Sequence, residues 1–167
     1  MPHGNISIDD PRAADVRALL RRHLELMHSV TPPEDVHALD LGGLLDPAVT
    51  FVSFRDGGEL LGIGALKQLD EGHGELKSMH TAAAARGRGV ARAILDHLLS
   101  LARDRGYLRV SLETGSMAEF VPARTLYATA GFTLCGPFAD YHPSPNSTFM
   151  TLELESRARD PEKDRVR

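Results

Sequence analysis

Residues 74–112 alternate between two β-like runs and one helix-like run, and this order constrains the fold more than any other feature of the chain. The run from Gly74 to Thr81 is β-rich, and a glycine-rich loop follows it at 86–91. From residue 90 to residue 102, apolar residues recur every three or four positions, which is typical of one buried helix face. Apolar and polar residues then alternate from Leu108 to Leu112. Strand, helix and strand at this spacing predict a βαβ unit with parallel strands and a right-handed crossover.

The segments on either side of this unit predict antiparallel neighbours. β-rich runs at 50–54 and 60–69 precede it, and glycine-containing turns at 55–59 and 70–73 join the three runs into a meander. A short strand is expected at 5–8, and two more strands are expected at 132–135 and 148–154. The whole predicts one mixed sheet.

Four helices are expected around this sheet. The first should run over 11–27, with Asp9-Asp10-Pro11 supplying a capping carboxylate and a proline at the first helical position. A second is expected over 34–45, although Gly42-Gly43 weakens it. The others are the helix that follows loop 86–91 and a short one over 122–130. Alternating helices and strands of this kind predict an α/β fold of the mixed, α+β type.

Length and composition favour one soluble domain. The chain has 167 residues, of which 42% are hydrophobic and 25% are charged, close to the averages of globular proteins. We expect a single domain over residues 1–155 and a charged C-terminal tail over residues 156–167. No apolar run approaches the roughly 20 residues that cross a bilayer, and residues 1–12 lack the apolar stretch of a signal peptide. We therefore expect a cytoplasmic protein with no membrane partner.

Charge, cysteine and histidine content argue against three further kinds of chemistry. The formal net charge of −4 and the pI near 6.0 argue against nucleic acid as a partner, because domains that bind it usually have a pI above about 9. Cys135 is the only cysteine, so no intramolecular disulfide can form. The eight histidines include no pair with the spacing of a zinc site, and we expect no metal.

The loop between the central strand and its helix has the features of a phosphate site. Free backbone N–H groups and the positive end of the helix dipole favour an anion at a helix N-terminus. Gly87 and Gly89 let the backbone approach a ligand closely, and Arg86 and Arg88 add positive charge.

This loop, Arg86-Gly87-Arg88-Gly89-Val90-Ala91, resembles the R/Q-x-x-G-x-G/A signature of the GNAT superfamily of N-acetyltransferases. Downstream, Ala123-x-x-Leu126-Tyr127-x-x-x-Gly131-Phe132 is similar to the superfamily's second signature, with the expected helix and strand between the two. Four more segments look like a bacterial GNAT subgroup whose substrates are poorly defined: His37-Ala38-Leu39-Asp40, Gly64-Ala65-Leu66-Lys67, Glu75-Leu76-Lys77-Ser78-Met79 and Leu112-Glu113-Thr114-Gly115-Ser116. One departure stands at Phe120, where the family often has asparagine.

The resemblance covers about residues 50–154 and implies the GNAT fold. In that fold a six- or seven-stranded, mostly antiparallel sheet opens between its two parallel strands, here around Met79 and Leu112, to admit the pantetheine arm. It also implies acetyl-CoA as cosubstrate and direct transfer of the acetyl group to a primary amine in a ternary complex. We expect that amine to belong to a small molecule.

Acetyl transfer from a thioester to an amine needs a deprotonated amine, stabilisation of the oxyanion and a proton for the departing thiolate. Tyr127 fits the last task, with packing beside Leu126 as the alternative. Glu75 and Glu113, on the two strands that flank the opening, are the candidates for the base. Glu75 could instead pair with Lys77, and Glu113 could instead bind the substrate ammonium.

The remaining site residues follow from their place in the family pattern. A backbone N–H near Met79 or His80 is the expected oxyanion donor. His28 and His37 flank the Pro32-Pro33 turn, in the region where the family builds its acceptor pocket, and with Thr114 they are the expected substrate contacts. The expected cofactor contacts are Met79, His80, Thr81, Arg86, Gly87, Arg88, Gly89, Val90 and Ala91.

Other functions stay open to different degrees. The acceptor could be a protein lysine or N-terminus, and only the acceptor pocket decides this. A non-catalytic acyl-CoA sensor would be favoured by a missing acid, and Tyr127 argues against it. A P-loop nucleotide site is excluded because the chain has no Gly-Lys-Ser or Gly-Lys-Thr. The sequence leaves the acceptor amine unidentified, and whether the chain forms a homodimer also remains open.

Overall fold

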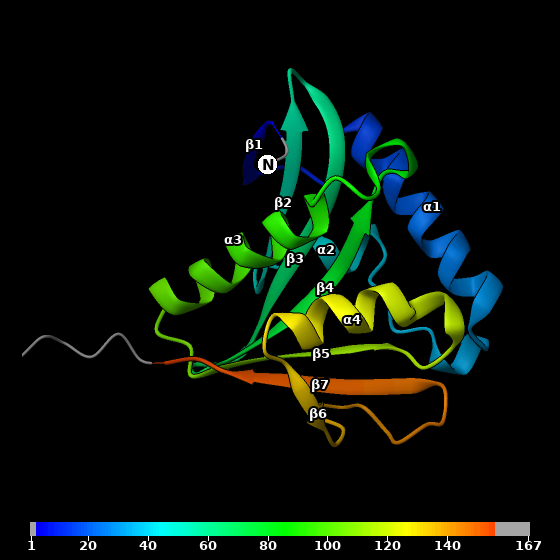
Figure 1. The fold of residues 1–167 in the computed structure, drawn as a ribbon, viewed down its shortest axis with the longest axis vertical. Coiled ribbons are helices and arrows are strands. Elements are labelled where there is room, and N and C mark those ends of the chain that lie inside the picture. Colours follow the sequence, from blue (N-terminus) through cyan, green and yellow to red (C-terminus); the bar gives the residue numbers. More distant parts are fainter. Residues whose placement is uncertain (1–2, 156–167) are drawn as a thin grey trace, which may run out of the picture.

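A computed structural model of the chain describes residues 3–155, so the expected tail at 156–167 lies outside the described residues. Seven strands form a single sheet in the order β1-β2-β3-β4-β5-β7-β6 (Figure 1). Their bounds are β1 (Asn5–Ile8), β2 (Val49–Asp56), β3 (Glu59–Asp70), β4 (His73–Thr81), β5 (Arg109–Gly115), β6 (Thr133–Cys135) and β7 (Ser147–Glu153). The predicted mixed sheet, its meander and its seven strands are confirmed.

The predicted βαβ unit lies at the centre of this sheet. Helix α3 (Val90–Asp104) connects β4 to β5, and these two strands are the parallel pair. Their pairing covers three positions and ends at Glu75 and Ser111. Beyond that point the two strands part, while β5 stays paired with β7 along its whole length. The expected opening between the parallel strands is therefore present.

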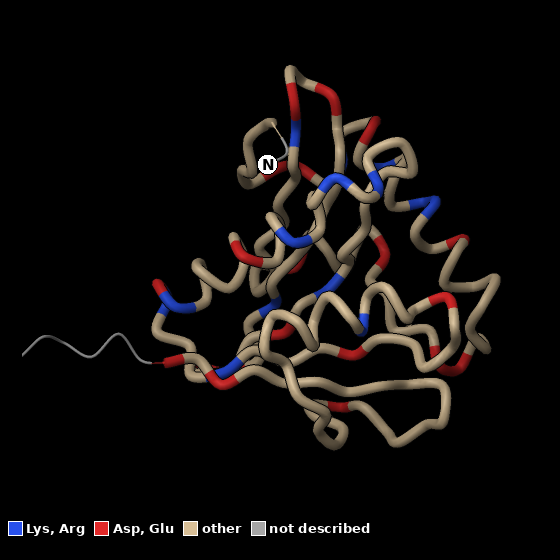
Figure 2. The backbone as a smooth tube through the Cα atoms, viewed as in Figure 1, with Lys and Arg blue, Asp and Glu red and all other residues tan. Residues whose placement is uncertain are grey.

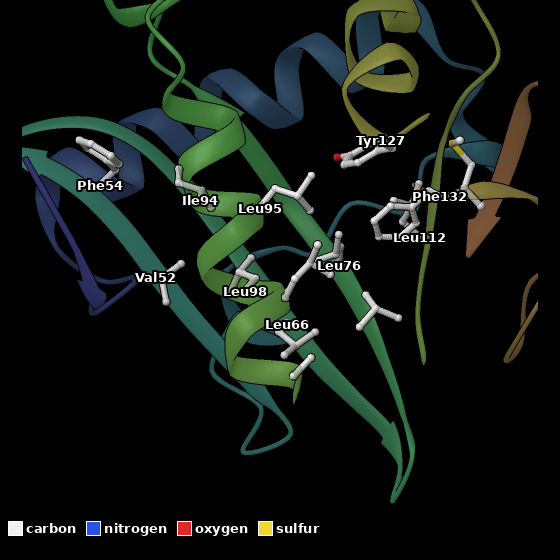
Figure 3. Close-up of a cluster of buried hydrophobic side chains, with 14 of the residues drawn as sticks. Val52, Phe54, Leu66, Leu76, Ile94, Leu95, Leu98, Leu112, Tyr127 and Phe132 are labelled. Carbon is white, nitrogen blue, oxygen red and sulfur yellow. The ribbon is translucent and has the colours of Figure 1, made fainter. Parts of the chain in front are cut away.

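Two apolar clusters occupy the two faces of the sheet because neighbouring strand residues alternate between them. Val52, for example, joins the cluster under α3, whereas Phe51 joins the cluster under α1 (Ala14–Val30). Figure 3 shows the first cluster, in which side chains of α3 meet those of β2, β3 and β4. Helices α3 and α4 (Val121–Thr129) cover this near face in Figure 1.

The start of α1 differs from the prediction. The helix begins at Ala14 rather than at Pro11, and no side chain caps it. The two aspartates have other partners: Asp10 accepts a hydrogen bond from the Arg12 backbone N–H (2.9 Å), and Asp9 accepts one from Arg55 of β2 (2.9 Å). At its other end the helix continues to Val30, a little beyond the expected Met27, before Pro32-Pro33 stops it.

The helix expected over 34–45 is wrong. The segment holds a single 3₁₀ turn, η1 (Pro33–Asp35), and a one-turn helix, α2 (Leu41–Leu44), with irregular backbone between them. Asp40 caps α2 by accepting a hydrogen bond from the Gly43 N–H (2.9 Å), so a helix restarts there instead of continuing. The segment 36–40 is left free to run along the mouth of the opened sheet.

Two more 3₁₀ turns flank the site. The turn η2 (Ala83–Ala85) lies between β4 and the glycine-rich loop, and η3 (Ala118–Phe120) leads into α4. The loop 136–146 then joins β6 to β7. Within residues 3–155, no helix is both long and apolar enough to cross a membrane.

Candidate active site

A cleft of about 960 Å³ opens where β4 and β5 part. The lining comes from the ends of these two strands, the glycine-rich loop, α4, the last turns of α1, the segment 35–38 and Tyr141. Segments far apart in the chain therefore meet around one cavity at the centre of the sheet.

At one end of the cleft, the glycine-rich loop starts helix α3. Gly87 has φ +76° and Gly89 has φ +81°, conformations that cost glycine little and other residues more. Gly89 occupies the N-cap position of α3, and no side chain within residues 3–155 caps this helix. The first backbone N–H groups of α3 are therefore available to a ligand in the cleft. Figure 2 shows basic residues in this loop and in the first turn of α3. This end of the cleft is suited to a phosphate group.

Strand β4 is bulged where it borders the cleft. Ile63 of β3 pairs with His80, but Ala65 pairs with Lys77, so β4 holds one more residue than β3 over this stretch. The distortion centres on Ser78, whose φ is +57°. A bulge takes a residue out of the ladder and leaves its polar groups available. Backbone near Met79, which lines the cleft with His80 and Thr81, can therefore offer an N–H to a ligand oxygen.

Tyr127 of α4 lies between the cleft and the core. The residue is buried, and its ring meets Phe132 edge-on at 5.8 Å between centroids. Figure 3 shows its hydroxyl directed away from Phe132, toward the side where α3 lies. Burial raises the pKa of the phenol well above its usual range, so the hydroxyl keeps its proton at neutral pH.

Glu75 and Lys77 of β4 form a buried network with Tyr141 of the 136–146 loop. The side chains of Glu75 and Lys77 are 4% and 8% exposed. Lys77 Nζ donates to Glu75 Oε2 (3.1 Å) and to the Tyr141 hydroxyl oxygen (2.8 Å), while that hydroxyl donates to the same Glu75 oxygen. The ion pair with Lys77, given above as the alternative role of Glu75, is present.

Glu113 of β5 lies in the same cleft but in a different environment. Burial raises its pKa to about 7, an effect that Lys77 only partly offsets and that the charge on Glu75 reinforces. A carboxyl group with such a pKa changes between its protonated and ionised forms near neutral pH. It is thus suited to accept a proton there.

Two segments meet over the far end of the cleft. Asn146 donates a hydrogen bond from Nδ2 to Asp35 (3.0 Å), and the Tyr141 ring meets the His37 ring edge-on at 4.9 Å. These contacts tie the 136–146 loop to the segment after α1. The two segments therefore border this end of the cleft together.

A pair of histidines connects α1 to β4 beside the bulge. His23 Nδ1 and His80 Nδ1 lie 3.1 Å apart, so one of them donates its proton to the other. The pKa of each imidazole is lowered to about 4, mainly by burial, with a smaller contribution from His80 for His23 and from Arg86 and Arg22 for His80. Both rings are neutral at pH 7.

The cleft gathers most of the residues expected from the sequence. It is lined by Glu75, Met79, His80, Thr81, Arg86, Gly87, Gly89, Val90, Ala91, Glu113, Thr114, Tyr127 and His37. Arg88 and His28 are not among its lining residues. Arg88 is exposed, and His28 lines a shallower hollow of about 710 Å³ between α1 and residues 39–41. No group of three or more His, Cys, Asp or Glu within residues 3–155 is arranged to hold a metal ion.

Comparison with known proteins decides the family. Residues 14–132 match the Acetyltransferase (GNAT) family. The chain belongs to the GNAT family. It is 52% identical to Uncharacterized N-acetyltransferase YsnE of Bacillus subtilis over 150 residues, covering 90% of this chain and 99% of that one. Uncharacterized N-acetyltransferase YedL of Escherichia coli is 50% identical over 149 residues, covering 89% and 94%.

A solved structure agrees with this assignment. The crystal structure of a candidate acyl-CoA N-acyltransferase from Klebsiella pneumoniae has a TM-score of 0.75 and 28% identity, covering 91% of this chain and 98% of that one. The protein is therefore an N-acetyltransferase of the GNAT family, and the expected fold and enzyme class are confirmed.

The departure from the usual GNAT pattern has a local explanation. Phe120 is 8% exposed, and its ring packs so closely on Gly115 that a Cβ there would come within 2.2 Å of it. The aromatic side chain thus fills space above the end of β5 and lines the cleft.

Two other cleft residues, Tyr141 and His23, belong to no family motif quoted above. The burial of His23 could have been predicted, because it falls three and four residues after Leu20 and Leu19 on the buried stripe of α1. No sequence pattern predicts the position of Tyr141, because its loop has no periodicity.

Proposed function

We propose that this GNAT enzyme transfers the acetyl group of acetyl-CoA to a primary amine of a small molecule, by direct transfer in a ternary complex in the cytoplasm. The observation that carries the proposal is the single cleft that joins the uncapped N-terminus of α3, the bulged strand β4, Tyr127 and Glu113. Each of these parts supplies one requirement of the reaction.

The cofactor residues divide by task. Backbone N–H groups of residues 87–91 would hold the pyrophosphate, with the Arg86 side chain adding charge. The pantetheine arm would pass between β4 and β5, where their pairing ends. The acyl-CoA N-acyltransferase description of the Klebsiella relative supports a donor of this class.

Glu113 is the better of the two candidate bases. Glu75 has its Oε2 atom occupied by both Lys77 and Tyr141, so that oxygen is held in an ion pair. Glu113 has a pKa of about 7 and can take a proton from a bound ammonium or amine. We assign Glu113 the role of base and Glu75 that of an orienting residue.

The proposed transfer forms one bond and breaks one bond, and two protons move. The amine nitrogen bonds to the carbonyl carbon, and backbone N–H groups near Met79 stabilise the oxyanion. The carbon–sulfur bond then breaks. Glu113 holds the proton that the nitrogen loses, while Tyr127 gives its hydroxyl proton to the thiolate and regains one from solvent.

The far end of the cleft favours a small molecule over a protein lysine or N-terminus. There, the contacts of Asp35 with Asn146 and of His37 with Tyr141 tie together the two segments that a polypeptide acceptor would have to pass between. A non-catalytic acyl-CoA sensor is disfavoured because Tyr127 and Glu113 are both present in the cleft.

A screen of primary amines with acetyl-CoA, read by release of free thiol, tests the proposal. We expect release that depends on both the amine and the enzyme, together with an acetylated amine detected by mass spectrometry. Tight binding of acetyl-CoA with no transfer to any amine would instead support the sensor.

A further inference from the structure

The acceptor end of the cleft differs sharply in charge from the cofactor end. We infer that the acceptor is an amine with an apolar body and no carboxylate beside the amine, such as an alkylamine or arylalkylamine, and that α-amino acids are rejected. This inference rests on the proposed function and adds the class of acceptor to it.

The positively charged side chains of the cleft either are paired with other residues or lie at the cofactor end. Among the described lining residues, the Lys and Arg side chains are Arg86, Arg92 and Lys77. The two arginines belong to the loop before α3 and to its first turn, and Arg92 also pairs with Asp96 at 3.0 Å. Lys77 lies at the acceptor end, but Glu75 and Tyr141 hold its ammonium group.

His37 adds no positive charge at the acceptor end. Its pKa is lowered by burial and by the nearby Lys77, so the ring is neutral at pH 7. A substrate carboxylate placed beside the reacting amine would therefore face Glu113, and no lining cation among residues 3–155 is free to pair with it. In a partly desolvated site, two like charges held close together strongly disfavour binding of the ligand.

Several other lining residues at the acceptor end are apolar. Leu26 and Met27 from the last turns of α1, together with Val36 and Ala38 from the segment after it, line the cleft beside the Tyr141 ring. Leu26 is 38% exposed, although it is a large apolar side chain. A surface of this kind suits a hydrocarbon or aromatic body, while Glu113 attracts the amine in its ammonium form.

Matched pairs of an amine and its parent amino acid test this inference directly. The pairs are 2-phenylethylamine with phenylalanine, isoamylamine with leucine, and tyramine with tyrosine, each measured with saturating acetyl-CoA by thiol release. Each pair has the same body and differs only in the carboxylate. We expect kcat/KM for the amine to exceed that for the amino acid by about 100-fold.

A substituted enzyme makes the test independent of intrinsic amine reactivity. Val36→Lys places a new ammonium on the acceptor wall and should reduce the amine-to-amino-acid ratio at least about tenfold, as pairing with a desolvated charge does. Val36→Met has a side chain of similar length without charge and should keep the wild-type ratio.

The outcomes separate the inference from the proposed function. Amino acids that are acetylated as well as their amines, or a ratio that Val36→Lys leaves unchanged, overturn the inference while the proposed function stands. Transfer to no member of any pair contradicts the inference, and it contradicts the proposed function as well only where the wider screen of primary amines also finds no transfer.

Discussion

Tyr141 donates its hydroxyl hydrogen to Glu75, a residue 66 positions earlier in the chain. The same hydroxyl accepts a hydrogen bond from Lys77, so one side chain ties the 136–146 loop to the central strand of the sheet. Ring contacts with His37, Phe138 and Phe149 hold the Tyr141 ring in place. This connection gives the acceptor end of the cleft its wall.

Tyr141→Phe should weaken acceptor binding and leave acetyl-CoA binding unchanged. The substitution removes two hydrogen bonds to charged groups, each worth about 1.5–3 kcal/mol, so KM for the amine should rise about tenfold or more. Steady-state kinetics and calorimetry measure the two quantities. Tyr107→Phe is the matched control, because the Tyr107 hydroxyl is buried and has no hydrogen-bond partner among residues 3–155. Equal KM values for Tyr141→Phe and wild type would mean that the network does not shape the acceptor site.

Glu113→Gln should remove a titration from the pH profile. If the carboxylate is the base, kcat/KM rises with pH as Glu113 ionises, with an apparent pKa of about 7. Loss of the base should lower the rate about 10²- to 10⁴-fold and abolish this limb. Glu119→Gln, on the exposed turn η3 at the same cleft, should retain it. A limb that survives in Glu113→Gln would assign the titration to another group.

Tyr127→Phe should impair chemistry more than binding. The ring and its contact with Phe132 remain, so the dissociation constant of acetyl-CoA should change little. Loss of a positioned general acid typically costs about 10²–10⁴ in rate. A kcat within about threefold of the wild-type value would show that water protonates the thiolate and that Tyr127 is structural.

The histidine pair should make stability depend on pH. Both His23 and His80 have a pKa of about 4 in the folded chain and the ordinary value near 6.5 when unfolded, so the unfolded chain binds more protons between these values. Their contribution to the free energy of unfolding is therefore fully present above about pH 6.5 and is lost as the pH falls toward 4.

Urea denaturation at several pH values measures this effect. The double substitution His23→Gln with His80→Gln should flatten the pH dependence relative to wild type. His28→Gln is a matched control on the same helix, since His28 is exposed and lies outside the cleft. An unchanged slope in the double variant would place the pH dependence elsewhere.

The parts of the fold that sequence could predict are those set by local patterns. The apolar stripe of α3, the β-rich run of β4 and the glycines before α3 all lie within residues 74–102, and each specifies its own conformation. The helix over 34–45 failed because Gly42-Gly43 lowers helix propensity while Asp40 caps a new turn. The predicted start of α1 was wrong because Asp9 accepts a hydrogen bond from Arg55 of β2, a contact between segments distant in sequence.

Only the site residues that belong to sequence motifs or to regular elements could be predicted from the sequence. Loop 86–91 and Tyr127 follow patterns that occur within single elements, and Tyr127 and all of the loop except Arg88 line one cleft. The pairing of Glu75 with Lys77 follows from strand alternation, but the third member, Tyr141, comes from a proline-rich loop whose course depends on tertiary contacts. His28 and His37 were both expected near the acceptor, yet helix geometry turns His28 to another hollow and His23 to the cleft.

Calorimetric titration with acetyl-CoA tests the central claim, that loop 86–91 holds the pyrophosphate at the start of α3. Wild-type protein should bind with a dissociation constant well below about 1 mM. Gly89→Glu should lose binding, because it places a carboxylate and bulk at the N-cap where the phosphate would lie. Gly57→Glu introduces the same side chain at another positive-φ glycine, in the turn between β2 and β3, and should bind like wild type. Wild-type protein that shows no binding at about 1 mM, or Gly89→Glu that binds as tightly as Gly57→Glu, would contradict the account.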